Sequence, residues 1–74
     1  MKATLKEIKK GEFFRLKDFD ENANYEGDTK FENSVWIKGE YDRGSKTYSC
    51  TKFSDVCHEH FFKGSKEVYI GFTF

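Results

Sequence analysis

Residues 35–53 constrain the fold of this chain more than any other segment. They read VWIKGEYDRGSKTYSCTKF, with two runs rich in Val, Ile, Thr and aromatic residues on either side of Asp42-Arg43-Gly44-Ser45. Runs of this composition favour strands, and the polar, Gly-containing tetrapeptide between them favours a turn. The sequence therefore predicts a β-hairpin. Gly39, inside the first run, predicts a bulge or a tight bend.

The composition indicates what fills the core. The chain has 74 residues, enough for one domain spanning 1–74, and it contains nine Phe, four Tyr and one Trp but only two Leu. Each buried aromatic side chain removes about 150–250 Å² from water, and aromatic residues favour strands over helices. We therefore expect a mostly-β domain with an aromatic core.

Three further elements are predicted around the hairpin. Thr4 and Glu7 have the spacing of a capping box and predict a one-turn helix. Residues 12–17 predict a strand that turns Phe14 and Leu16 toward the core, and residues 68–74 predict the last strand, because apolar residues alternate in both segments.

A short helix is expected just before the last strand. Ser54 can cap its beginning, and Gly64 can end it, so one or two turns fit residues 54–63. The resulting fold class is mostly β with a minor α+β character. Four or five strands and one short helix then form either a small SH3-like barrel or a curled antiparallel sheet.

Residues 18–33 form an acidic segment inside the domain. Six acidic and one basic side chain lie in residues 18–34, whereas residues 1–17 hold six basic and two acidic ones, and the whole chain is neutral. A long connection of this kind is often functional, and a solvated loop that offsets the basic N-terminal strand explains the same composition. We expect a loop here.

Side-chain alternation in the hairpin predicts a binding face. Val35, Ile37, Gly39 and Tyr41 are expected to point inward, and Trp36 and Lys38 outward. An outward Trp among cations is unusual and indicates a binding surface. The candidate binding residues are Trp36, Lys38, Arg43, Lys46, Lys52 and Phe53.

Two functions fit such a face, and packing alone is a third explanation. A Trp-centred surface can bind a protein partner, which is the function we expect, with no catalytic role. The alternative is a nucleic-acid-binding module whose aromatic rings stack on bases beside Lys and Arg side chains. If Trp36 packs beneath the loop or the helix instead, both functions lose their central residue.

The cluster Cys57-His58-Glu59-His60 has ligand types that zinc prefers, but the spacing is wrong for a structural zinc site. Its Cys and His neighbours also lack a third orienting residue for nucleophilic catalysis. No Gly-rich phosphate-binding loop is present. We therefore expect no metal, no cofactor and no enzymatic activity.

The location expected for this protein is the cytoplasm. No apolar run approaches the roughly 20 residues that a membrane-spanning helix needs, and no signal peptide is evident, so no membrane association is expected. Cys50 and Cys57 are then expected to be free thiols. An exposed strand edge is a possible site for pairing of two copies into a homodimer.

Several short stretches are shared with a group of short uncharacterised bacterial proteins, often associated with mobile elements. These stretches are Gly39-Glu40-Tyr41-Asp42-Arg43, Ser45-Lys46, Tyr48-Ser49-Cys50, Lys52-Phe53, His58-Glu59, Lys63-Gly64, the ending Val68-Tyr69-Ile70-Gly71-Phe72-Thr73-Phe74, and Lys10-Gly11-Glu12 with Phe14. The chain resembles that group over about its last 40 residues. The resemblance implies a bacterial, cytoplasmic, stand-alone small domain and no particular activity.

Overall fold

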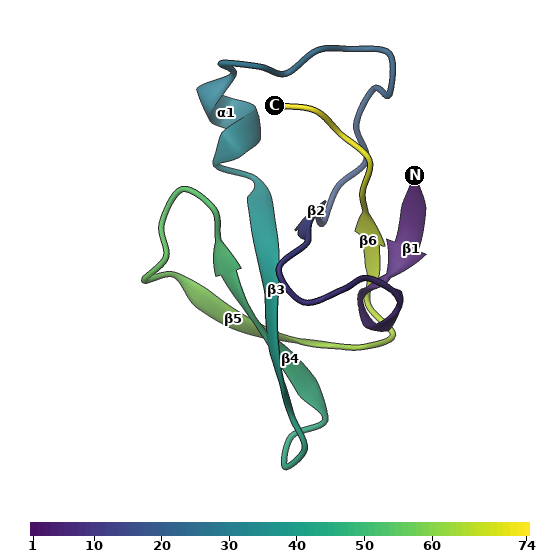
Figure 1. The fold of residues 1–74 in the computed structure, drawn as a ribbon, viewed down its shortest axis with the longest axis vertical. Helices are drawn as coiled ribbons and strands as arrows, with labels where there is room; N and C mark the ends of the chain where they lie inside the picture. The colour runs from purple at the N-terminus through teal and green to yellow at the C-terminus, as the bar shows by residue number, and fades with distance from the viewer.

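A computed structural model describes residues 1–74 and shows one six-stranded antiparallel sheet with strand order β1-β6-β2-β3-β4-β5 (Figure 1). The elements are β1 (Lys2–Thr4), the 3-10 turn η1 (Leu5–Glu7), β2 (Phe13–Arg15), α1 (Thr29–Glu32), β3 (Val35–Asp42), β4 (Thr47–Lys52), β5 (Glu59–Lys63) and β6 (Glu67–Tyr69). The predicted mostly-β class and curled sheet are confirmed. The sheet has one more strand than expected, and it does not close into a barrel.

The predicted hairpin is β3 and β4, joined by a turn at residues 43–46. Their pairing is regular from Trp36 to Lys38 and shifts before Tyr41, so a bulge lies at Gly39 as expected. Beyond the bulge, the hairpin extends away from the sheet to the lower end of Figure 1. Tyr41, expected inside, is therefore 47% exposed, which corrects its predicted orientation.

The predicted capping box is confirmed at η1. Glu7 Oε1 accepts hydrogen bonds from Thr4 N–H (2.9 Å) and Thr4 Oγ1–H (2.6 Å), and these bonds lower the pKa of Glu7. Leu5 N–H and Lys6 N–H donate to the carbonyls of residues 66 and 64. The turn thus holds the connection between β5 and β6.

The main core lies on the face of the sheet that carries Phe14, which we call the inner face. It contains Leu5, Ile8, Phe14, Trp36, Cys50 and Val68, packed against the partly buried Ala3, Leu16, Tyr48, Phe62 and Ile70. Phe14 is fully buried, as its sequence pattern predicts. The aromatic character expected for the core is present.

The opposite face of the sheet, which we call the outer face, is covered at one end by α1 and the C-terminal residues (Figure 1). Phe31 of α1 is 4% exposed and stacks on Tyr25 with ring centroids 3.9 Å apart. Phe72 packs edge-on against Phe31 at 5.1 Å, and Phe19 joins both. The acidic segment therefore contributes rings to the core as well as charges to the solvent.

The last strand ends at Tyr69, shorter than predicted.

The helix predicted for residues 54–63 is wrong. Residues 54–58 form a turn, in which Asp55 accepts from the N–H groups of Cys57 and His58, and β5 begins at Glu59. The side chains of this segment alternate between the two faces of the sheet, and β4 presents to it a row of backbone N–H and C=O groups. Pairing with that row outweighs the local signals for a capped helix.

The predicted sides of β3 are also reversed. Phe14 is paired directly with Trp36, so both side chains lie on the inner face of the sheet. Val35 is fully buried as well, but on the outer face, beneath the end covered by α1. Alternation correctly divided residues 35–38 into two sets but did not identify which set contacts the main core, and the bulge puts Tyr41 on the side of Trp36 and Lys38.

Candidate functional site

Trp36, the central residue of the predicted site, is buried at 7% exposure. Its ring packs edge-on against three rings of the inner face of β5 and the preceding turn, at centroid distances of 5.6 Å to His58, 5.6 Å to His60 and 5.3 Å to Phe62. It therefore cannot stack face-on with an incoming base. This corrects the prediction of an exposed tryptophan.

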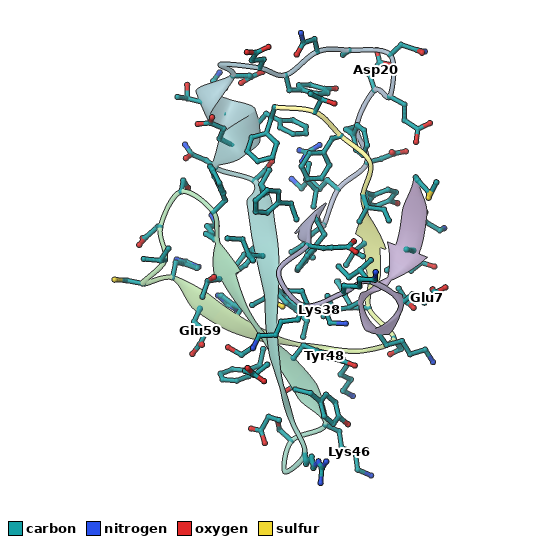
Figure 2. All side chains as sticks on the ribbon, viewed as in Figure 1. Glu7, Asp20, Lys38, Lys46, Tyr48 and Glu59 are labelled. Carbon is teal, nitrogen blue, oxygen red and sulfur yellow. The ribbon has the colours of Figure 1, made fainter.

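Lys38, also predicted to be exposed, is 5% exposed and belongs to the core. Its Nζ donates to the Ile8 carbonyl and lies 4.1 Å from the centre of the Tyr48 ring (Figure 2). Burial lowers the pKa of Lys38, and the neighbouring Cys50 and Glu12 oppose that shift. Lys38 thus links the turn after η1 to the sheet through the Ile8 carbonyl. Its prediction as a binding residue is wrong.

The remaining predicted residues fall in two separate places. Arg43 and Lys46 are exposed in the hairpin turn, and Figure 2 shows Lys46 far from Lys38. Lys52 and Phe53 lie at the other end of β4, where Lys52 Nζ is 5.7 Å from the centre of the Trp36 ring. The structure therefore does not bring the six predicted residues together. It keeps Lys52 beside Trp36 and places Phe53 on the outer face.

A pocket of about 310 Å³ lies beside Trp36 and Lys52. Its six lining residues are Arg15, Leu16, Lys17, Ser34, Trp36 and Lys52. We call it the cationic pocket, because it has three basic side chains and no acidic one. Leu16 and Trp36 provide apolar walls. A pocket of this kind suits a ligand that combines a negative charge with an apolar part.

Arg15 is held in place before any ligand arrives. Its Nε donates to Ser34 Oγ (2.7 Å), its NH1 donates to the Asp18 carbonyl (2.9 Å), and its guanidinium lies 4.5 Å from the centre of the Phe31 ring. These contacts link β2 to the acidic segment and α1. A donor fixed in this way loses little conformational freedom on binding an anion.

A cluster of phenylalanine rings lies on the outer face of the sheet. Phe13, Phe53 and Phe74 contact one another edge-on at centroid distances of 5.4, 5.5 and 5.1 Å, and we call these three residues the outer phenylalanine patch. Phe13 is 41% exposed and Phe53 is 38% exposed. Phe13 lies two residues from Arg15 along β2, on the same face. Arg15 therefore shares the face of the patch, whereas Trp36 and Lys52, which also line the pocket, lie on the inner face.

Sequence analysis missed Arg15, Lys17, Ser34 and Phe13 as candidates. A signal for Arg15 and Phe13 was present, because a strand with Phe14 inside turns both neighbours outward. The placement of Arg15 in one pocket with Lys52, and of Phe13 against Phe53, depends on the order β2-β3-β4, which the pattern of a single strand does not contain.

The two cysteines and the two histidines lie in different surroundings. Both cysteines are free, Cys57 exposed and Cys50 buried, and burial raises the pKa of Cys50. His58 and His60 stack on each other with centroids 5.2 Å apart and pack on Trp36. No group of three or more His, Cys, Asp or Glu side chains is placed to hold a metal ion.

Comparisons of the chain with protein-family models, curated proteins and solved structures give no match. The resemblance to short bacterial proteins therefore stays a prediction. Neither helical segment has the length and apolar character that crossing a bilayer requires.

Proposed function

We propose that this protein is a non-enzymatic binding module for a protein partner, and that it takes an acidic, partly apolar segment of that partner. The observation that carries the proposal is the cationic pocket, which has three basic lining residues, no acidic one and a Trp36 wall. An acidic side chain is the complement of such a lining.

The outer phenylalanine patch supports a peptide over a small free anion. Exposed aromatic side chains are enriched at protein interfaces, where their large area is buried at a low cost in side-chain entropy. Arg15 lines the pocket and lies on the same face of the sheet as Phe13, so a bound segment that passes Arg15 can reach both the pocket and the patch. In the partner segment, the acidic residue fixes the orientation in the cationic pocket, and the neighbouring apolar residues bury area against the outer phenylalanine patch.

Nucleic acid is the alternative occupant of the same pocket. Lys17 and Lys52 can neutralise phosphates as well as carboxylates. However, stacking on bases needs an accessible ring face beside the cations, whereas Trp36 is buried and the exposed Phe53 ring lies on the opposite face from Lys52. The peptide is therefore the better fit. A cytoplasmic setting is part of the proposal, and two free thiols favour it.

Trp36 provides an internal reporter for the test, because it is the chain's one tryptophan and forms a wall of the pocket. The probes are Trp-free peptides that alternate Glu and Leu, matched peptides with Gln for Glu, and a single-stranded oligonucleotide. Titration with the Glu peptide should change the fluorescence of Trp36 in a saturable way, and the Gln peptide should not.

The variants separate the pocket from general charge effects. Lys52→Gln should weaken binding of the Glu peptide by about tenfold, since it removes a charge-assisted contact. Lys46→Gln, the same change at the hairpin tip, should leave it unaltered. Saturable binding of the oligonucleotide with steep salt dependence, and none of the Glu peptide, would establish the alternative and overturn the proposal. Equal weakening by both variants would also overturn it.

A further inference from the structure

β5 is an edge strand, and its edge away from β4 has no partner in the sheet. It pairs with β4 alone, and four of its five side chains are exposed, with Phe61 at 54%. η1 contacts the end of β5, where Lys6 N–H donates to the Gly64 carbonyl, so the open part of the edge begins at Glu59 and Phe61. No proline blocks the edge, since the chain contains none. Such an edge is a template for another strand.

The hydrogen-bond pattern shows which backbone groups of β5 are free. Lys52 N–H donates to the His58 carbonyl (3.0 Å), and the register pairs Cys50 with His60. Hydrogen-bonded pairs alternate along an antiparallel ladder, so His60 and Phe62 direct their backbone groups at β4. Glu59, Phe61 and Lys63 therefore direct theirs at the open edge, where the Lys63 carbonyl already accepts from Lys66 N–H (3.0 Å) and the other groups are free.

These three residues are complementary to a reversed copy of themselves. An antiparallel β5 from a second molecule, centred on Phe61, places Glu59 opposite Lys63 and Phe61 opposite Phe61. In this register the facing pairs of Glu59, Phe61 and Lys63 have their backbone groups directed at the other strand, and His60 faces Phe62 in the non-hydrogen-bonded pairs between them, as the ladder requires. Opposite charges facing each other across two strands are favourable.

We infer that the occupant of this edge is a second copy of the chain, and that β5 pairs with β5 about a two-fold axis through Phe61 to form one continuous sheet. The other registers with outward backbone groups set Phe61 opposite Glu59 or Lys63 and pair fewer residues. A two-fold axis also makes the contact closed, so it stops at two molecules.

Glu59 is already oriented for this role. Its Oε2 accepts from the hydroxyl of Ser49 on the neighbouring strand, which holds the carboxylate on the outer face of β5. Lys63 and Phe61 lie on the same face by alternation. The paired strands would carry Glu59 to Lys63 contacts at both ends and the two Phe61 rings between them.

The dimer is independent of the acidic-segment proposal, because no residue of β5 lines the cationic pocket. Its test is a charge exchange followed by sedimentation equilibrium up to about 1 mM. The wild type should show twice the mass of the 8.8 kDa chain. Lys63→Glu and Glu59→Lys each set like charges opposite each other twice in the dimer, and each should raise its dissociation constant by about tenfold or more.

The double variant Glu59→Lys with Lys63→Glu restores opposite charges and should dimerise within about threefold of the wild type. Lys9→Glu makes the same charge change at an exposed position outside β5 and should have no effect. A wild type that stays at 8.8 kDa throughout, or a double variant no better than the single ones, overturns the inference.

Hydrogen exchange gives a second readout that does not depend on a variant. Amides of His60 and Phe62 should be protected at all concentrations, since they bond to β4. Amides of Glu59, Phe61 and Lys63 should exchange fast in dilute protein and become protected as the dimer forms. Dimerisation without that alternating change would place the contact elsewhere and refute pairing through β5.

Discussion

Gly39→Ala should destabilise the protein strongly, because the bulge in β3 brings another backbone against this position. A Cβ placed on Gly39 would lie 2.3 Å from the carbonyl oxygen and 3.3 Å from the carbonyl carbon of Ser49 on β4. Both atoms belong to the ladder between β3 and β4, so no side-chain rotation relieves the contact. The strands must separate by about an ångström to restore ordinary van der Waals distances.

The size of the effect follows from that displacement. Forcing additional atoms into a packed region costs about 1–3 kcal/mol, and we expect about 2–3 kcal/mol here because rigid backbone must move. A chain of 74 residues has a free energy of unfolding of about 4–11 kcal/mol. The substitution should therefore lower Tm by about 10–20 °C in a domain of this size.

Urea denaturation followed by circular dichroism measures the loss in free energy of unfolding, and Gly44→Ala is the matched control. A Cβ on Gly44 would meet only the side-chain Oδ1 of Asp42 at 3.3 Å, in the exposed hairpin turn. That change should stay within about 0.5 kcal/mol of the wild type. If Gly39→Ala were as mild as the control, the close packing inferred at the bulge would be refuted.

Three further predictions concern buried groups. The fluorescence of Trp36 should be blue-shifted and weakly quenched by acrylamide in the folded protein, and red-shifted, strongly quenched emission would contradict its burial. Burial lowers the pKa of Lys38 below its ordinary value of 10.5. As the pH rises, the folded state therefore loses the Lys38 proton at a lower pH than the unfolded state does, and between those two pH values the unfolded state binds more protons. The free energy of unfolding of the wild type, minus that of Lys38→Met, should accordingly rise as the pH approaches 10.5 in a series of urea titrations, and a falling difference would reverse the sign of the argument. Iodoacetamide should alkylate Cys57 in the folded protein and reach Cys50 only after unfolding, which mass spectrometry of the peptides can check.

The local features of the fold were accessible from the sequence. The hairpin, its turn, the bulge at Gly39 and the capping box at Thr4 and Glu7 each depend on residues close together in the chain. The excess of aromatic residues over Leu indicated the β class, because large rings pack well on sheets. These predictions needed no knowledge of which strands become neighbours.

The helix expected for residues 54–63 is absent, because local signals did not determine the structure of this segment. Ser54 and Gly64 carry signals for capping, but caps contribute about 1 kcal/mol each, and a short isolated helix is marginal in water. Pairing with β4 gives that segment a ladder of backbone hydrogen bonds and packs Phe62 against the core. A long-range contact therefore determined its secondary structure.

The sequence by itself determined that β3 has two distinct faces, since successive side chains in a strand point oppositely. Only the tertiary structure decided that Trp36 is on the inner one, because its pairing with Phe14 across β2 and β3 sets that choice. The cationic pocket was decided in the same way. Arg15 and Lys52 lie far apart in the chain, and the order of the strands brings them together around a buried ring.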